Sequence, residues 1–250
     1  MSTVVGRHAA PARQGGRAGG SEVELARRVV AVLGGRYSAE LGIDVDAGDT
    51  QVERWFVAAT LFGARIPAQV AERAFGVLAA AGLTRIGQFR HVPSAGLIAM
   101  LDAGGYARYD IRTAERLLQL CEVIRDRYDG QAAVIGRRFA AYPDLCAALG
   151  ALPGWGPVTV RLFLRELRGT WPGACPPLDE RAAAAARHLG LTAARAGLPG
   201  LAGLATASGL DVRDVESGLV RLALAHGRAM GRCPGGQACT ALRPPGPGER

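Results

Sequence analysis

Apolar residues recur along most of the chain at the three- and four-residue spacing of a buried helical face. In the segment 111–128, this spacing places Ile111, Ala114, Leu117 and Cys121 on one side. Aromatic residues make up only 6% of the chain while Gly and Ala are abundant, so we expect helices that pack through small residues. The sequence therefore predicts an all-α protein. Helices are expected at 21–33, 50–62, 67–81, 93–103, 111–128, 143–149, 157–167, 180–189, 201–207 and 211–225.

Two polar pairs have the spacing of a capping box, in which side chains accept hydrogen bonds from amides at a helix start. Ser21 with Glu24 would begin the first helix, and Thr50 with Glu53 would begin the next. Residues 37–49 are predicted to be a loop. Residues 1–20 are rich in Gly, Ala and Arg without periodicity, which predicts a disordered basic tail, and residues 241–250 are expected to fray.

A glycine turn with the sequence Leu-Pro-Gly-Trp-Gly, residues 152–156, separates two of the predicted helices. Pro143 fits the first turn of the helix before it, and Gly150 is suited to ending that helix. Pro157 fits the first turn of the helix that follows. The segment is therefore predicted to be a helix–hairpin–helix.

The two glycines of this turn, Gly154 and Gly156, can adopt backbone angles closed to other residues and let another molecule approach the main chain. Amides at the start of the second helix have no partner within it, and the helix dipole there favours an anion. A nucleic-acid phosphate suits this place, and the alternative is a plain helical hairpin whose glycines only form the turn. The candidate DNA-binding residues are Leu152, Gly154, Trp155, Gly156, Val158 and Thr159.

After the second hairpin helix, a proline-rich passage leads to Leu178-Asp179-Glu180-Arg181 and an alanine-rich helix. A hairpin followed one helix and one loop later by an aspartate resembles the helix–hairpin–helix DNA glycosylases, the HhH-GPD or endonuclease III superfamily. The resemblance extends more loosely from about residue 50 to about residue 239. It implies a two-lobed helical fold with an active-site cleft between the lobes. Residues 21–49 and 173–240 would form one lobe, and residues 50–172, with the hairpin at 143–167, the other.

This resemblance implies a DNA glycosylase of base excision repair, acting as a monomer on double-stranded DNA that contains a damaged or mismatched base. Such an enzyme flips the base out of the duplex and hydrolyses its N-glycosidic bond. A carboxylate beside the sugar would stabilise the positive charge that develops there. Asp179 is the candidate catalytic residue. Its structural alternative, compatible with catalysis, is the N-cap of the helix that starts at Glu180.

Bifunctional members of the family attack the sugar with a lysine amine and then cut the strand. The resemblance places Val158 where that lysine would stand. Every basic residue counted among the 30 Lys and Arg is an arginine, so no lysine side chain can replace it. We therefore expect a monofunctional glycosylase without Schiff-base lyase chemistry.

Many endonuclease III relatives end in four cysteines that hold a [4Fe–4S] cluster. Cys233 and Cys239 have the spacing of the last pair, but the first two ligands are missing. Because four thiolates are normally needed, we expect a remnant of the loop with no cluster and no metal. Two cysteines and a histidine could hold a zinc ion with some fourth ligand, but nothing in the sequence favours it.

In the resembled family, the segment equivalent to 62–66 approaches the DNA, which makes Arg65 the candidate wedge or phosphate contact. The candidate linings of the base pocket are Trp55, Phe62, Tyr106 and Tyr109. The lesion stays open among uracil, mismatched thymine, oxidised pyrimidines, alkylated purines and adenine opposite a damaged guanine.

The net charge of +8 and the pI near 9.9 suit a polyanionic partner. No run is apolar and long enough to span a bilayer, and the first 20 residues lack the apolar core of a signal peptide, so a cytoplasmic protein is expected. Two other functions remain open. One is a noncatalytic DNA-binding protein derived from a glycosylase, and the other is a helical module whose hairpin binds protein.

Overall fold

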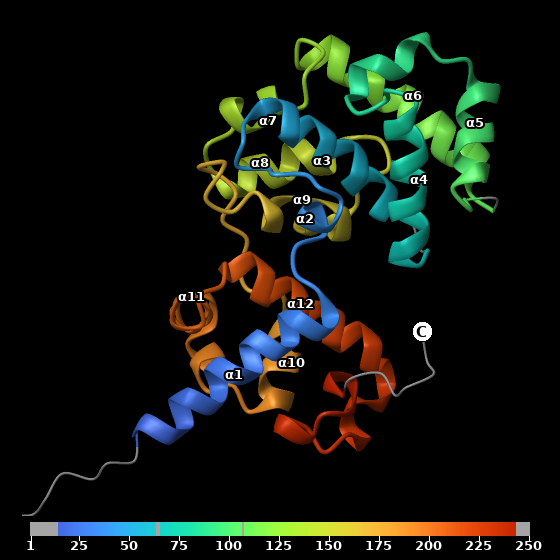
Figure 1. Cartoon of the computed structure of the whole chain (residues 1–250). Coiled ribbons are helices and arrows are strands. Elements are labelled where there is room, and N and C mark those ends of the chain that lie inside the picture. The colour runs from blue at the N-terminus through green and yellow to red at the C-terminus, as the bar shows by residue number, and fades with distance from the viewer. Residues whose placement is uncertain (1–14, 64–65, 107, 244–250) are drawn as a thin grey trace, which may run out of the picture. The chain divides into compact units, whose positions relative to one another are not determined.

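The computed structural model describes residues 15–63, 66–106 and 108–243, and the side chains from Gly20 onward. Its regular elements in these ranges are helices, which confirms the all-α prediction (Figure 1). The chain divides into two compact units. The terminal unit contains the chain up to Gly34 and from Glu180 onward, and the central unit contains Gly35–Asp179. Among the described residues, no helix is long and apolar enough to cross a membrane.

The terminal unit is built around α12 (Val212–His226), which packs against α1 (Gly15–Leu33), α10 (Glu180–Leu189) and α11 (Gly197–Ala207). Small residues allow the close approach: a Cβ on Gly218 would lie 2.8 Å from Val29 Cγ1. Four short 3-10 helices complete this unit. They are η2 (Ala193–Ala196), η3 (Gly227–Arg232), η4 (Gly236–Ala238) and η5 (Thr240–Leu242).

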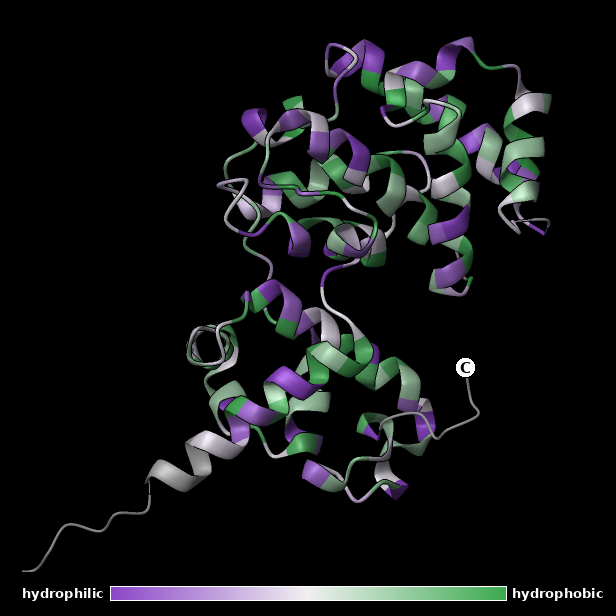
Figure 2. Cartoon of the chain, in the orientation of Figure 1, coloured by the Kyte–Doolittle hydropathy of each residue, from purple (hydrophilic) through white to green (hydrophobic). Residues whose placement is uncertain are grey.

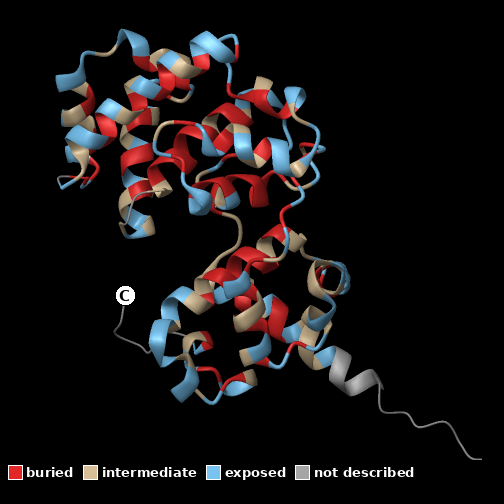
Figure 3. Cartoon of the chain, turned by 180° about the vertical axis from the view of Figure 1, so that it is seen from behind, coloured by how far each residue is buried: buried red, intermediate tan, exposed pale blue. Residues whose placement is uncertain are grey.

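The central unit is organised around α3 (Asp49–Phe62), of which nine of the 14 residues are buried. Helix α3 packs against α4 (Ala68–Ala80), α7 (Ala133–Arg138) and α9 (Pro157–Glu166). In both units, apolar positions coincide with the buried faces of the helices (Figure 2, Figure 3). The remaining elements are α2 (Tyr37–Glu40), η1 (Ile86–His91), α5 (Ser94–Ala103), α6 (Asp110–Arg127) and α8 (Tyr142–Gly150).

The predicted helices are present, with corrections at several ends. Helix α1 begins at Gly15, so residues 15–20 of the predicted tail are helical, while residues 1–14 lie outside the described residues. Ile111 is 58% exposed, so the buried face of α6 starts only at Thr113. At the other end of the chain, Leu242 is buried rather than frayed. Residues 35–49 and 173–179, expected in the first lobe, belong to the central unit.

Two buried carboxylates accept hydrogen bonds from the first amides of helices that lie far from them in the sequence. Glu53 does not form the expected capping box, because α3 has Gly48 as its N-cap and the Glu53 carboxylate accepts a hydrogen bond from the Ala133 amide of α7 at 2.8 Å. Glu166 is fully buried and accepts hydrogen bonds from the Tyr37 and Ser38 amides at 3.0 and 3.1 Å. These contacts hold α7 and α2, neither of which the sequence predicted, against the core.

Candidate functional site

The glycine turn joins α8 and α9 as a helical hairpin, as predicted. The Trp155 amide donates to the Leu152 carbonyl at 3.1 Å, which closes the turn. Gly154 has a φ of +76°, which L-residues rarely adopt, and it therefore requires glycine for conformational reasons. Gly156 is the N-cap of α9 in an extended conformation, with Pro157 as the first helical residue.

Trp155 is a core residue, which corrects the expectation that its side chain contacts DNA. It is only 3% exposed and stacks on Phe56, with ring centroids 4.6 Å apart. It also meets Phe163 edge-on at 5.1 Å, and its indole N–H donates to Thr60 Oγ1 at 3.2 Å. Leu152 is likewise buried, at 4% exposure. These two side chains fix the hairpin to α3 and α9 and cannot face a ligand.

The exposed part of the hairpin is mostly main chain. Gly154 and Gly156 are exposed, and Val158 is 62% exposed. No side chain caps the start of α9, and the amides of Val158 and Thr159 are too early in the helix to have an intrahelical partner. The Thr159 side chain is buried and lies so close to Gly63 that a Cβ there would be 2.3 Å from Thr159 Oγ1. Thr159 can therefore contribute only its amide to a ligand.

Arg116 of α6 lies beside the turn. A Cβ on Gly154 would stand 2.0 Å from Arg116 Nε, so the guanidinium group lies directly against the glycine. Arg116 is half-buried, which limits the number of positions its side chain can take. A positive charge beside exposed amides strengthens the preference of this place for an anion. The sequence gave no signal for Arg116, because it lies on a helix distant along the chain.

The predicted catalytic residue Asp179 is buried, and it lies next to α9. Arg161 Nη1 is 3.7 Å from Asp179 Oδ2, with the Arg161 side chain 45% exposed and the Asp179 side chain 8% exposed. Residues three apart in a helix share a face, so Val158 projects from the same side of α9 as Arg161. Val158 and the Asp179 carboxylate therefore lie toward the same side of α9.

The remaining candidates are two core residues, two half-buried residues and one residue that lies outside the described part of the chain. Trp55 and Tyr106 are buried, and the Tyr106 hydroxyl donates to the Leu61 carbonyl. Burial raises the pKa of that hydroxyl. Phe62 is half-buried and packs on Tyr37 at 5.2 Å, and Tyr109 is half-buried. Arg65 lies outside the described residues. Trp55 and Tyr106, expected to line the base pocket, are therefore core residues.

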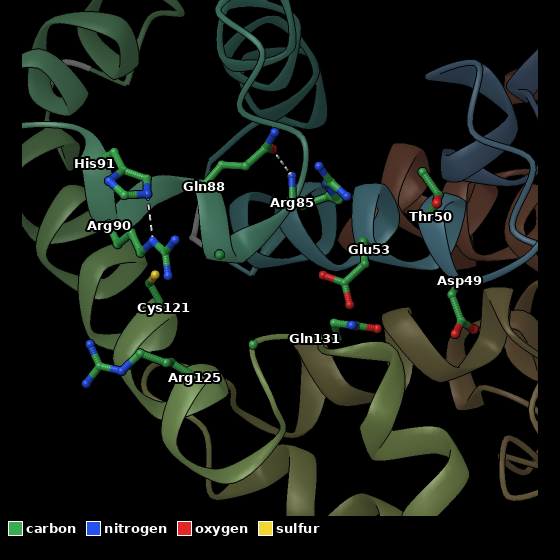
Figure 4. A pocket seen from close by; sticks show the side chains of 12 residues that line it. Asp49, Thr50, Glu53, Arg85, Gln88, Arg90, His91, Cys121, Arg125 and Gln131 are labelled. Atoms are coloured by element: carbon green, nitrogen blue, oxygen red, sulfur yellow. Dashed lines mark hydrogen bonds between the residues drawn. The ribbon is translucent and has the colours of Figure 1, made fainter.

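A cavity of about 410 Å³ opens in the central unit between the start of α3, η1 and α6 (Figure 4). Burial raises the pKa of Glu53, on its wall, to about 7. Several of its polar groups are already engaged: Gln88 accepts from the Thr84 and Arg85 amides, and Arg90 donates to His91. It contains none of the predicted site residues. Its lining is Asp49, Thr50, Glu53, Arg85, Gly87, Gln88, Arg90, His91, Cys121, Arg125, Gly130 and Gln131.

A second group of chemically active side chains lies in the terminal unit. His188 joins His226, Cys233 and Cys239, and the four potential ligand atoms all lie within 4.8 Å of one another. The sequence had singled out the two cysteines as a remnant and had not included His188. These four residues are the described side chains best placed to hold a metal ion.

Comparisons with protein-family models, with curated proteins and with solved structures found no match.

Proposed function

We propose that this protein is a DNA glycosylase of the helix–hairpin–helix type, monofunctional, which hydrolyses the N-glycosidic bond of a base flipped out of duplex DNA. One observation carries the proposal: Arg161, one turn into the hairpin's second helix, is paired with the buried Asp179. This contact brings the candidate carboxylate to the helix whose free amides would hold the DNA. Double-stranded DNA as the partner and a cytoplasmic location are parts of the same proposal.

Binding begins with a backbone phosphate at the start of α9. The amides of Gly156, Val158 and Thr159 would donate to its oxygens, and Arg116 beside Gly154 adds a positive charge. Holding a phosphate in this way fixes the duplex backbone while the base swings out of the stack. Such contacts carry no sequence information, so they serve damaged and undamaged DNA alike.

The chemical step breaks the bond between C1′ of the deoxyribose and the base nitrogen. The electron pair of that bond leaves with the base, and positive charge develops on the sugar. A carboxylate at Asp179 stabilises that charge and accepts a proton from the water whose oxygen bonds to C1′. The ion pair with Arg161 fixes the position of the carboxylate before DNA arrives.

The reaction ends at an abasic site, because the side chain at the lyase position is Val158. Valine has no nucleophile, and an arginine cannot replace lysine since its guanidinium stays protonated. The exposed Val158 would therefore contact the DNA without attacking it.

The test is a panel of labelled duplexes, each with one damaged or mismatched base, incubated with wild type, Asp179→Asn and Asp144→Asn. Asp144 is an exposed carboxylate in the first turn of α8 and serves as the matched control. Hot alkali cuts abasic sites, so we expect strand breaks after alkali with wild type and with Asp144→Asn, and none with Asp179→Asn. Breaks without alkali would contradict the monofunctional assignment.

The second candidate is a noncatalytic DNA-binding protein, which the uncapped start of α9 supports by itself, because its amides can hold a phosphate whether or not Asp179 takes part in a reaction. No product on any duplex, together with tight and salt-sensitive binding, would establish this function instead. Salt sensitivity matters because phosphate binding releases counterions. Absence of both product and salt-sensitive DNA binding would leave the hairpin as a protein-binding module and refute both proposals.

A further inference from the structure

A histidine and cysteine cluster forms in the terminal unit where four segments meet. His188 lies in the last turn of α10, and His226 is the last residue of α12. Cys233 follows η3, and Cys239 lies between η4 and η5. Their ligand atoms lie within 4.8 Å of one another, although the residues come from two helices and the segment that follows them. We propose that His188, His226, Cys233 and Cys239 form a structural zinc site.

The dimensions of the cluster suit one tetrahedral ion. Zinc binds cysteine sulfur at about 2.3 Å and histidine nitrogen at about 2.0–2.1 Å, which places neighbouring ligand atoms about 3.3–3.8 Å apart. His226 Nε2 and Cys239 Sγ are 3.1 Å apart, and the widest separation in the cluster exceeds the tetrahedral range by only about 1 Å. Small rotations of the side chains would complete the geometry.

The same donors fit an iron–sulfur cluster poorly. A [4Fe–4S] cluster normally takes four thiolates, and only two thiols are present in this group. Two histidines and two cysteines can hold a [2Fe–2S] centre, but there the two histidines bind one iron and the two cysteines the other. In this cluster a histidine and a cysteine are in direct contact, and all four atoms converge on one point. Mixed nitrogen and sulfur ligands around one centre are the usual ligands of structural zinc.

The buried ring nitrogen of His188 is a further indication that a metal ion binds here. Its Nε2 atom is buried and makes no hydrogen bond of normal geometry in the described structure. An unsatisfied buried nitrogen costs free energy unless something binds it. The backbone beside it is also shaped for the contact, because Gly235 has a φ of +72° and a Cβ there would lie 2.3 Å from the His188 carbonyl oxygen. Glycine at this position lets the loop that carries Cys233 lie against α10.

The surroundings of Cys233 favour a thiolate, as a zinc ligand requires. The Thr240 amide donates to Cys233 Sγ at 3.3 Å, and the Thr240 hydroxyl lies 3.4 Å from it. The ligand geometry and these sulfur contacts are independent observations that agree.

Four protein ligands leave no open position, so the ion would serve the fold rather than catalysis. The segment 227–243 consists of 3-10 turns and buries only two side chains, Cys239 and Leu242. Polar contacts with α1 also hold it, since Arg28 donates to the Leu242 carbonyl at 2.9 Å and Gln237 donates to Ser21 Oγ at 2.9 Å. A zinc ion would tie this segment to the ends of α10 and α12. Binding free energy from the metal then becomes folding free energy of the terminal unit.

The experiment measures metal in the purified full-length protein by mass spectrometry, and then tests the site with cobalt. We expect about one zinc per chain, and we expect Co²⁺ exchanged for it to give the thiolate charge-transfer and intense visible bands of a tetrahedral site. His188→Asn and Cys233→Ser should lower zinc affinity by at least about tenfold in competition with a chelator. His91→Asn and Cys175→Ser, which alter exposed residues of the same types outside the cluster, should leave it unchanged.

Each alternative outcome would overturn the proposal. The first is that the purified protein contains iron and inorganic sulfide. The second is that it contains no metal and has a Cys233–Cys239 disulfide. The third is that His188→Asn binds zinc with the wild-type affinity. Melting of the wild type with and without a strong chelator gives a second readout that needs no variant: removal of zinc should lower the melting temperature. Since none of these measurements involves DNA, the zinc proposal and the glycosylase proposal fail separately.

Discussion

The substitution Gly156→Ala tests whether the hairpin main chain binds phosphate. Gly156 is exposed, its φ of −91° is open to any residue, and a Cβ built on it meets no protein atom within 4 Å. The added methyl group would therefore occupy the space in front of the turn without disturbing the fold. That space is where a phosphate bound to the first amides of α9 would lie.

The expected change in stability is small because two effects oppose each other. Replacing glycine by alanine where the backbone permits it stabilises a protein by about 0.4–1 kcal/mol, since the unfolded chain loses freedom. Alanine is a poorer N-cap than glycine, which costs a similar amount, and Gly156 is the N-cap of α9. The free energy of unfolding should therefore change by less than about 0.5 kcal/mol.

The expected change in DNA binding is much larger. A hydrogen bond to a charged group contributes about 1.5–3 kcal/mol, and a methyl group that displaces the phosphate would remove at least one such bond. At about 1.4 kcal/mol for each factor of ten, the Kd for duplex DNA should rise roughly 10- to 100-fold. If the displaced phosphate is the one that Arg116 neutralises, the slope of log K against log salt should also fall by about 1.

Fluorescence anisotropy with a labelled duplex at several salt concentrations measures both quantities. Gly150→Ala is the matched control, because Gly150 is also exposed with open space at its Cβ but ends α8, on the other side of the turn from the amides of α9. We expect Gly150→Ala to bind like wild type. If Gly156→Ala also bound like wild type with an unchanged salt slope, the hairpin would not be the phosphate site.

Two further predictions concern the lyase position and a buried acid. Val158→Lys should form a covalent adduct with abasic duplex DNA, which borohydride reduction traps. Ile111→Lys is the control, since Ile111 is an equally exposed apolar residue of α6, and it should form no adduct. If Val158→Lys formed no adduct either, position 158 would not face the sugar. Burial raises the pKa of Glu53 from 4.5 to about 7, so the ionised form is less favourable in the folded chain and stability should fall as the pH rises from about 4.5 to about 7. Urea unfolding of Glu53→Gln across that range should lack this fall of up to about 3 kcal/mol, and an identical pH dependence in both proteins would contradict the assignment.

The sequence predicted those helices whose apolar face repeats over several turns. Helices α3, α4, α5 and α10 lie within about two residues of the predicted ranges, as boundary signals allow. The short helices α2 and α7 were missed for a physical reason, because Glu166 and Glu53, far away in the chain, supply the acceptors for their first amides. No local pattern records a cap that comes from another helix.

In the candidate sites, too, the sequence predicted the features formed by neighbouring residues and missed the residues that other helices contribute. The turn, its glycines and the proline that begins α9 are local features and were predicted. Arg116 beside Gly154 and His188 beside the cysteines come from other helices, and the sequence gave no indication of either. The burial of Trp155 could not be predicted locally, because two of the side chains that surround its ring, Phe56 and Thr60, come from α3, far away along the chain.

The burial of Leu152, Trp155 and the Thr159 side chain has a consequence for specificity. With these side chains in the core, the turn and the first residues of α9 present amides, two glycines, Pro157 and Val158, none of which has a side chain that can hydrogen-bond to the edge of a base. Main-chain contacts to phosphate position a protein on DNA without distinguishing sequences or lesions. The hairpin would therefore contribute equal affinity for damaged and undamaged duplexes, and Gly156→Ala should weaken both by the same factor. Any preference for a lesion must arise from residues outside the turn and the first residues of α9.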